Sequence, residues 1–302
     1  MKINVIGVPL NLGCDRLGVE RAPNHLRERG LMQLIRKNGH RAFDLGNLYV
    51  PPVSEADKFA RGKSMKYLDA IVEVNNNLAE LVYDTLRGGA FPLVIGGDHS
   101  LGLGSTAGAA LACDNIGVIW FDAHGDFNTE ETSPSGNLHG MPCAALMGWC
   151  KSRLAEVATK QIPSQNFFWI GARDLDPGEV EFAKEYNLHI YTADMVREKG
   201  MAVVMSEVIK TLEAQNINKV HLSIDIDGMD PSIICGTGTK VEDGLNNGQF
   251  YTFVDSIFAT NKVVSTDLVE YNHLLDDEDE TTGKWCIEAL HYLALKIKNI
   301  NH

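Results

Sequence analysis

Three potential metal ligands follow one apolar segment of the chain. The run from Ile116 to Phe121 leads directly into Asp122, His124 and Asp126, which are spaced two residues apart. At the end of an extended segment, alternate side chains point to the same side, so two carboxylates and an imidazole converge on one small volume. Their mutual repulsion and desolvation are unfavourable without a cation. The spacing therefore predicts a divalent metal site, with a solvated acidic loop as the alternative.

A second segment repeats this arrangement. Asp225 and Asp227 lie two residues apart at the end of another apolar run, and the isoleucines beside them point to the opposite side. Asp230 precedes Pro231 and is more simply explained as a turn or cap residue. The segment therefore contributes two further carboxylates to the predicted site.

A glycine-rich segment, Gly96 to Ser100, offers a second imidazole, His99, although a single histidine after a strand is more often structural. The complete candidate set contains two histidines, four aspartates and no cysteine: His99, Asp122, His124, Asp126, Asp225 and Asp227. Such an oxygen-rich set favours Mn²⁺ or Mg²⁺ over structural zinc. Six ligands are too many for one catalytic ion but fit two ions that share carboxylates. Paired ions lower the pKa of a bound water, so the predicted chemistry is metal-hydroxide hydrolysis.

The composition excludes several other classes of protein. The formal net charge of −13 argues against a nucleic-acid or anionic-membrane partner, because such partners need a basic face. The six cysteines are scattered without a CxxC pair, which is typical of a reduced compartment. The apolar run at the N-terminus is too short for a signal peptide, and no window approaches a membrane span. We therefore expect a cytoplasmic, soluble protein.

Short β-branched runs alternate with amphipathic segments along the whole chain. Strands are expected at Ile3–Gly7, Arg41–Leu45, Pro92–Ile95, Ile116–Phe121, Phe167–Ile170, His189–Tyr191, Val220–Ile224 and Val263–Leu268. Helices are expected at 23–37, 65–86, between the third and fourth strands, near 178–186, 200–214 and 248–259, and at about 283–298, with 46–62 as a loop. This alternation predicts one α/β domain over residues 1–302, a three-layer α-β-α sandwich around a parallel eight-stranded sheet. Ligands bind at the carboxyl ends of such strands, where the polar motifs fall.

The segments GGDHS (96–100), DAHGD (122–126) and SIDIDGMDP (223–231) closely resemble the ureohydrolase family, which includes arginases and agmatinases. The resemblance extends from Gly7 to about Ala294 and is nearest to arginase. It implies the arginase-like fold and two Mn²⁺ ions per subunit. By this resemblance one ion would be held by His99, Asp122, Asp126 and Asp225, and the other by Asp122, His124, Asp225 and Asp227. Asp122 and Asp225 would bridge the two ions.

The loop after the metal motif resembles the arginase segment that binds the α-carboxylate of L-arginine. That role would fall to Asn128, Ser135 and Asn137, although these residues alone are equally compatible with a simple turn. Agmatine has no carboxylate and would not need them. Asp176 matches the aspartate that contacts the α-amino group, or it caps the helix that follows.

Two further residues match the family's catalytic machinery. Glu270 corresponds to the glutamate that binds the guanidinium, and His139 to the histidine that transfers protons. The resemblance implies that a metal-bridging hydroxide attacks the guanidinium carbon and that Asp126 passes a proton to the departing amine. The products would be L-ornithine and urea.

The chain also departs from the usual arginase pattern. Lys240 and Asp243 stand where proline and glycine are common, and Gly125 and Met141 replace the commoner threonine and glutamine. The segment 246–250 lacks the Tyr-Arg-Glu element that supports subunit contacts in the family. The resemblance still implies a homo-oligomer, a trimer or hexamer, with a different interface.

Three rival functions remain open from the sequence. One is another guanidino hydrolase, such as an agmatinase or guanidinobutyrase. A second is a deacetylase-type amidohydrolase with a single zinc ion, against which His99 and Asp126 argue because they complete a second metal site. The third is a non-catalytic metal-binding protein.

Overall fold

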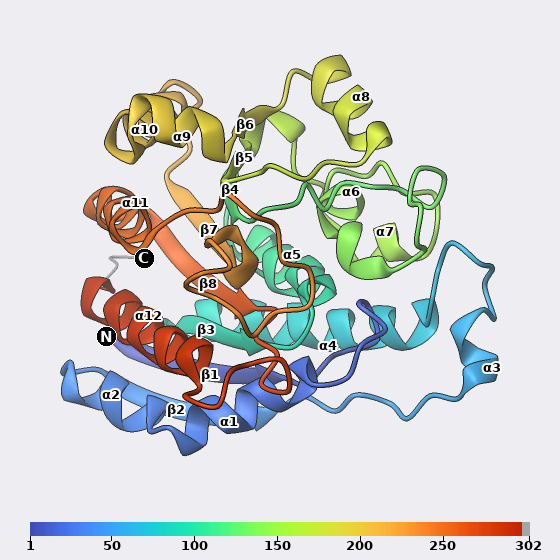
Figure 1. Ribbon diagram of the computed structural model, residues 1–302, viewed down its shortest axis with the longest axis horizontal. Helices are drawn as coiled ribbons and strands as arrows, with labels where there is room; N and C mark the ends of the chain where they lie inside the picture. Colours follow the sequence, from blue (N-terminus) through green and yellow to red (C-terminus); the bar gives the residue numbers. More distant parts are fainter. Residues whose placement is uncertain (298–302) are drawn as a thin grey trace.

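The computed structural model describes residues 1–297, and within them eight strands form one sheet with parallel pairing throughout (Figure 1). The strands are β1 Lys2–Val8, β2 Arg41–Asn47, β3 Phe91–Gly96, β4 Ile116–Phe121, β5 Phe167–Ile170, β6 His189–Tyr191, β7 Lys219–Asp225 and β8 Val263–Val269. Their order is β2-β1-β3-β8-β7-β4-β5-β6. The predicted α/β sandwich with a parallel eight-stranded sheet is confirmed.

Helices cover both faces of this sheet and create two separate apolar cores (Figure 1). One core contains side chains of α1 Ala22–Glu28, α2 Leu31–Lys37, α9 Ala193–Lys199, α10 Met201–Ala214, α11 Asn247–Ala259 and α12 Thr281–Lys296. The other contains side chains of α4 Leu68–Arg87, α5 Gly102–Ala112, α6 Pro142–Leu146 and α7 Leu154–Val157. Alternate residues of β4 enter opposite cores: Ile119 and Phe121 the first, Val118 and Trp120 the second. This alternation explains why the strand is apolar throughout.

Several helix boundaries differ from the sequence-based expectations. The helix expected at 23–37 is two helices, because Gly30 adopts a φ of 87° between them. The expected loop 46–62 contains a short helix, α3 Glu55–Lys58, which begins where the Ser54 N–H donates to the Asp57 carboxylate. The expected closing helix ends at Lys296, and residue 298 lies outside the described residues.

The four strands that precede the metal motifs and Glu270 are consecutive neighbours in the sheet. The order β3-β8-β7-β4 places the ends of these strands side by side, with Ile95 paired to Leu268, Leu268 to Ile224 and Ile224 to Phe121. The segments that follow them therefore meet at one edge of the sheet, although they are far apart in sequence. Within residues 1–297, no helix is both long and apolar enough to cross a membrane.

Candidate active site

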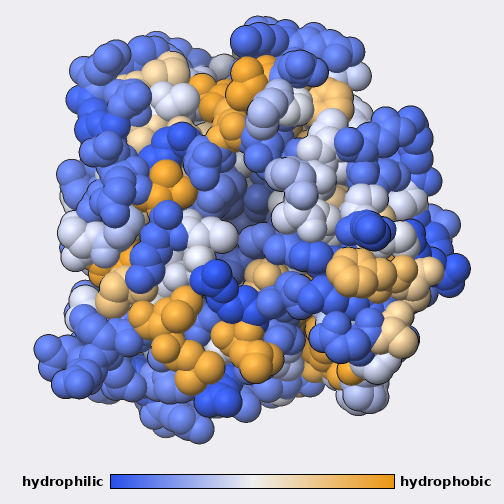
Figure 2. All heavy atoms as spheres, turned by 45° about the vertical axis from the view of Figure 1, so that its right-hand side comes forward, coloured by the Kyte–Doolittle hydropathy of each residue, from blue (hydrophilic) through white to orange (hydrophobic). Residues whose placement is uncertain are grey.

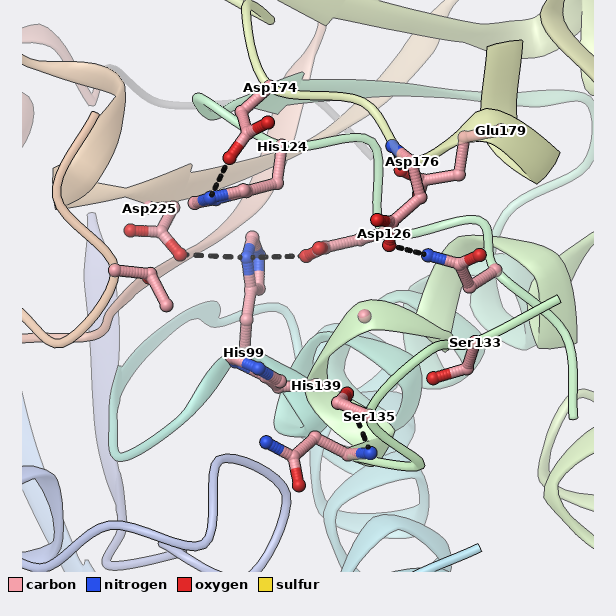
Figure 3. A pocket seen from close by; sticks show the side chains of 14 residues that line it. His99, His124, Asp126, Ser133, Ser135, His139, Asp174, Asp176, Glu179 and Asp225 are labelled. Atoms are coloured by element: carbon pink, nitrogen blue, oxygen red, sulfur yellow. Dashed lines mark hydrogen bonds and ion pairs between the residues drawn. The ribbon is translucent and has the colours of Figure 1, made fainter. Parts of the chain in front are cut away.

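All six candidate metal ligands meet at the carboxyl edge of the sheet, and Figure 3 shows four of them, His99, His124, Asp126 and Asp225. The first group surrounds the Nδ1 atom of His99, which follows β3 in a short 3₁₀ turn, His99–Leu101. Carboxylate oxygens of Asp122, Asp126 and Asp225 lie 2.9, 3.0 and 3.1 Å from this nitrogen. Three acidic groups thus share one imidazole nitrogen in a buried position.

The second group surrounds the Nδ1 atom of His124. Asp122 Oδ1 lies 3.3 Å from this nitrogen and Asp227 Oδ2 lies 3.2 Å from it. Asp122 belongs to both groups, because its Oδ2 atom faces His99 and its Oδ1 atom faces His124. The geometry therefore gives two adjacent clusters of metal-ligating atoms joined by one carboxylate.

The backbone and a tryptophan fix the shared carboxylate. Asp122 Oδ1 accepts a hydrogen bond from the His124 N–H at 2.7 Å, and the Trp120 indole N–H donates to Asp122 Oδ2 at 3.1 Å. The Trp120 ring also stacks on the His99 ring, with centroids 4.1 Å apart. Asp126 adopts a φ of 57°, a left-handed conformation that is uncommon outside glycine and turns its carboxylate toward His99.

The raised pKa values of two carboxyl groups in the cluster show that their charged forms are unfavourable without a cation. Burial and the nearby Asp227 and Asp122 charges raise the pKa of Asp225 well above its usual range, and burial together with Asp122 raises the pKa of Asp126 to about 6. Burial disfavours the charged imidazoles, but the neighbouring aspartates outweigh it and raise the pKa of both His99 and His124. The group therefore needs either protons or a cation.

The donor atoms of His99 fit a metal ion. Its Nε2 atom lies 2.8 Å from Ser223 Oγ, whereas its buried Nδ1 atom has no hydrogen-bond partner despite the three carboxylates around it. Ser223 in turn donates to Asp267 Oδ1 at 2.5 Å, and Asp267 Oδ2 lies 3.0 Å from His221 Nε2. With Nε2 protonated toward the serine, the Nδ1 lone pair faces the carboxylates and is available for a cation.

A polar cavity of about 120 Å³ opens beside the two clusters. Its lining includes all the residues predicted to contact the substrate except Glu270. Asn128 and Asp176 meet in its wall, where Asn128 Nδ2 donates to Asp176 Oδ2 at 2.8 Å (Figure 3). Asp176 also begins helix α8, Pro177–Glu185, so it has the capping position as well as a place in the cavity. Ser135 lies on the opposite side, and its Oγ accepts the N–H of Asn137 at 3.1 Å.

Glu270 and His139 form a pair next to this cavity. Glu270 Oε1 accepts the His99 backbone N–H at 2.8 Å and lies 3.1 Å from His139 Nδ1. Burial disfavours the charge on His139, but the carboxylate prevails and raises the pKa of His139 above its usual value. Glu270 is buried and lines a smaller adjoining cavity, together with His139 and Thr239, rather than the main one.

Three residues at the site were not predicted from the sequence. Trp120 holds Asp122, Thr239 donates to Asp227 Oδ2 at 2.8 Å, and the two Glu179 oxygens each accept a backbone N–H, from Phe127 and from Asp176. The alternation along β4 could have identified Trp120, because it precedes Asp122 by two residues and points to the same side. Glu179 lies in the first turn of α8, where its spacing from Asp176 is the local pattern of a capping box, whereas no local pattern indicates that Thr239 reaches Asp227.

The unusual residues near the site have distinct surroundings. Met141 is fully buried in the second core and does not line the cavity, whereas Lys240 and Asp243 are exposed. Asn246 accepts the Gln249 N–H at 3.0 Å and caps α11, so the segment 246–250 builds a helix start. Gly125 has no room for a side chain, because a Cβ atom would lie 2.5 Å from the Phe127 ring and 2.7 Å from Glu179 Oε1.

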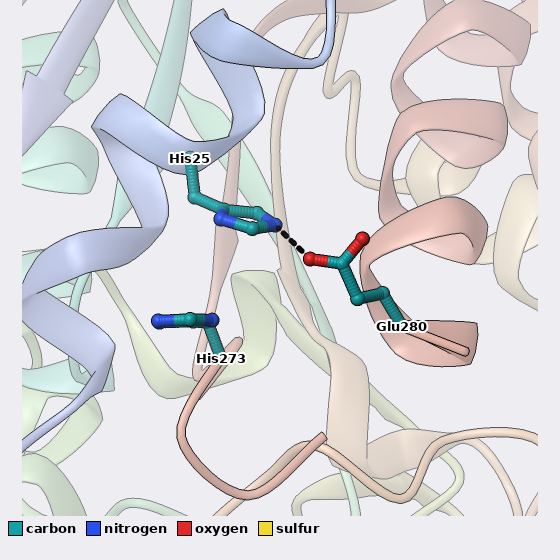
Figure 4. A group of neighbouring side chains, drawn as sticks. All are labelled: His25, His273 and Glu280. Carbon is teal, nitrogen blue, oxygen red and sulfur yellow. Dashed lines mark ion pairs between the residues drawn. The ribbon is translucent and has the colours of Figure 1, made fainter. Parts of the chain in front are cut away.

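A separate group of possible ligands lies between α1 and the start of α12 and comprises His25, His273 and Glu280 (Figure 4). The two imidazole rings stack with centroids 4.8 Å apart, and His25 Nε2 lies 3.4 Å from Glu280. Arg29 already donates to His25 Nε2 at 2.8 Å and forms an ion pair with Glu280. A guanidinium thus supplies the cation here, and the cluster joins α1 to α12.

The surface around the sheet edge is mixed in character. Figure 2 shows a hollow near the middle of one face, bordered mostly by hydrophilic side chains, with separate apolar patches below it. The cavity beside the ligands has the same polar character: its described lining includes the carboxylates Asp126, Asp174, Asp176, Glu179 and Asp225 and neither lysine nor arginine. A cationic ligand would therefore be favoured there.

Comparison with known proteins identifies relatives over nearly the whole chain. A model of the Arginase family matches residues 1–295. An arginase of Brevibacillus brevis is 41% identical over 281 residues, which cover 92% of this chain and 93% of that protein. An arginase of Bacillus subtilis strain 168 is 38% identical over 296 residues, covering 97% and 98% of the two chains.

Solved structures give the same result for the fold. The crystal structure of Bacillus subtilis arginase matches with a TM-score of 0.90 at 37% identity, covering 97% of this chain and 98% of that one. Entamoeba histolytica arginase, solved in complex with L-ornithine, matches with a TM-score of 0.89 at 32% identity and the same coverage. The expected resemblance and fold are both confirmed.

Proposed function

The chain belongs to the Arginase family, and from this premise we propose that it hydrolyses the guanidinium group of L-arginine to L-ornithine and urea. The enzyme class follows from the family: a hydrolase that acts on the C–N bond of a linear amidine. The observation that carries the proposal is the pair of ligand clusters joined by Asp122, beside a cavity lined by Asn128, Ser135, Asn137 and Asp176.

The cofactor proposed is two Mn²⁺ ions per subunit. One would be held by His99, Asp122, Asp126 and Asp225, and the other by Asp122, His124, Asp225 and Asp227. Hard oxygen ligands with two imidazoles and no thiolate support manganese over structural zinc. Bound there, the ions would supply a water activated as the nucleophile. The chain's own contribution is to hold the six ligands, five of them buried, in place through contacts that include those of Trp120, Ser223 and the backbone.

Substrate orientation is assigned to Glu270, which lines the smaller adjoining cavity, and to four residues that line the main cavity. The Glu270 carboxylate would bind the guanidinium, a planar cation for which a fixed carboxylate is a good partner. Asp176 would contact the α-amino group, and the uncharged donors of Asn128, Ser135 and Asn137 would bind the α-carboxylate. The hydrogen bond between Asn128 and Asp176 supports this division, because it places the amino-binding and carboxylate-binding groups next to each other.

Two residues would move protons. Asp126 would pass a proton to the departing amine. His139 would exchange protons between the site and solvent, and its Nδ1 contact with Glu270 holds the ring toward the cavity. Both are proposed catalytic residues.

The test is urea release by the manganese-loaded protein and by a chelated sample. Hydrolysis of L-arginine that depends on added Mn²⁺ and exceeds hydrolysis of agmatine is expected. High activity on agmatine alone would instead establish the runner-up, agmatinase or another guanidino hydrolase, and would remove the argument for carboxylate binding. Retained manganese without hydrolysis of any guanidino compound would favour a non-catalytic protein.

We also propose that residues 1–302 form a single catalytic domain and that the protein acts in the cytoplasm as a trimer or hexamer. Light scattering coupled to size-exclusion chromatography should then give three or six times the subunit mass of 33.2 kDa. A monomer would be consistent with the missing Arg-Glu element and would contradict the assembly.

A further inference from the structure

A lysine outside the cavity donates a hydrogen bond to one of the residues assigned to carboxylate binding. Lys66 precedes α4, and its ammonium donates to Asn137 Oδ1 at 2.7 Å. The backbones are joined as well, since the Lys66 N–H donates to the Gly136 carbonyl at 3.0 Å. Gly136 has a φ of 71°, and a side chain there would collide with the Lys63 carbonyl oxygen. The segment 63–66 is therefore closely fitted against the loop 135–137.

The lysine settles the orientation of the Asn137 amide. An ammonium can only donate, so the atom beside it must be the amide oxygen, and the NH₂ group must face the other way. Within residues 1–297, that NH₂ group makes a single long contact, 3.4 Å to the Cys14 carbonyl oxygen. At least one of its two protons is thus available to a ligand in the cavity that Asn137 lines.

The same lysine supplies a permanent positive charge behind a cavity whose described lining contains neither lysine nor arginine. Five carboxylates line the cavity, and each of them repels a ligand carboxylate that comes near it. Lys66 is largely buried, with 16% of its side chain exposed, and its ammonium is held directly behind Asn137. A carboxylate bound by the Asn137 NH₂ group would lie on the far side of an amide polarised by this charge.

We propose that Lys66 is a positioning and specificity residue, which orients and polarises Asn137 so that the site prefers amino acids that carry an α-carboxylate over their decarboxylated analogues. This inference rests on the proposed hydrolysis of L-arginine and adds a residue that does not touch the substrate. It also explains how uncharged donors can bind an anion inside an acidic cavity.

The chain contains a matched control for this proposal. Lys58 forms an ion pair with Asp15, the same carboxylate that lies 3.7 Å from the Lys66 ammonium, and its side chain is 17% exposed. Its described contacts do not include Asn137. Lys58→Met and Lys66→Met thus remove equal charge from equally buried positions around Asp15, and they differ in the contact with Asn137.

The experiment compares these variants as manganese-loaded full-length proteins. For Lys66→Met we expect the KM for L-arginine to rise about 10-fold with kcat nearly unchanged, the loss expected for a hydrogen bond to a charged group. The inhibition constant of L-ornithine should rise in parallel, and that of 1,4-diaminobutane, which lacks the carboxylate, should not change. Lys58→Met should resemble the wild type, and Lys66→Arg should restore most of the affinity.

A double-mutant cycle shows whether the effect passes through Asn137. If it does, Lys66→Met should add nothing in an Asn137→Ala background. Equal weakening of L-ornithine and 1,4-diaminobutane, or the same change in Lys58→Met, would overturn the inference. A wild-type protein without activity on L-arginine would instead refute the proposed function, so the two failures are distinguishable.

Discussion

Individual side chains at the site are oriented by fixed partners. The contact between His99 Nε2 and Ser223 directs the Nδ1 lone pair toward the carboxylates, and the Trp120 N–H holds Asp122 between the two imidazoles. The contact between Glu270 and His139 fixes the orientation of the His139 ring. Because the proposed metal ligands and the proposed proton-transfer histidine are different residues, single substitutions should separate metal binding from the exchange of protons by His139.

The first prediction concerns His139. His139→Asn removes an imidazole that can exchange protons but none of the six candidate ligand residues, so turnover should fall about 10²- to 10⁴-fold while both metal ions stay bound. Steady-state kinetics with metal analysis by mass spectrometry measures both. His124→Asn is the control and should lose metal. Loss of metal from His139→Asn as well would show that its role is misassigned.

The pair of His139 and Glu270 also predicts a dependence of stability on pH. The carboxylate raises the pKa of His139, and the histidine lowers the pKa of Glu270 despite its burial. A histidine with a raised pKa contributes stability that is complete below its unfolded pKa, about 6.5, and is lost as the pH rises through the folded value. In the metal-free protein, His139→Asn should therefore lower the free energy of unfolding by about 1.5–3 kcal/mol near pH 6.

The same substitution should have a smaller effect near pH 9, because the stabilisation from the ion pair declines as the pH rises through the raised pKa of His139. Chemical denaturation of both proteins at the two pH values provides the measurement. An effect of equal size at both values would mean that the ion pair does not titrate in this way.

At the scale of elements, Glu179 connects helix α8 to the loop that follows Asp126. It closes the start of the helix through the Asp176 N–H and binds the loop through the Phe127 N–H, both at 3.0 Å. Burial raises the pKa of Glu179 to about 8. The two backbone N–H donors act in the opposite direction, because they favour the charged carboxylate. Gly125 lets Glu179 come this close to the loop, because a Cβ atom at position 125 would lie only 2.7 Å from Glu179 Oε1.

Gly125→Ala should consequently lower the free energy of unfolding by about 1–3 kcal/mol, the usual effect of overpacking a filled interior. Gly140→Ala is the matched control, since a Cβ atom at Gly140 would meet nothing within 4 Å. Thermal or chemical unfolding of the three proteins measures the difference. Equal free energies of unfolding for the two variants would show that Phe127 and Glu179 can move aside for the added methyl group at little cost.

At the scale of the whole molecule, the sheet brings four buried aspartates to one edge, and their repulsion opposes folding in the absence of cations. Removal of metal with a chelator should lower the melting temperature by about 5 °C or more, because ligands that bind only the folded state stabilise it. Scanning calorimetry of the chelated protein, before and after Mn²⁺ is added back, measures this change and shows whether it is reversible. A melting temperature unaffected by chelation would mean that the cluster is stabilised by protons alone.

The sequence by itself indicated most of the elements and the candidate ligand set. The apolar runs and the period of two placed all eight strands, and the spacing of Asp122, His124 and Asp126 indicated a shared side, because strand geometry is local. Gly30 was misjudged, since the amphipathic pattern continues across the break that its φ of 87° introduces. Residues 46–62 were misjudged as a loop throughout, because a four-residue helix leaves almost no periodic signal.

The tertiary structure alone decided which distant groups meet. That Asp122 shares its two oxygens between two histidines, that Thr239 reaches Asp227, and that Lys66 binds Asn137 all depend on the strand order and on loop packing. These contacts join residues up to 71 positions apart, and no periodicity encodes them. Strand order is set by the cooperative packing of both cores, which is a property of the complete chain rather than of any one segment.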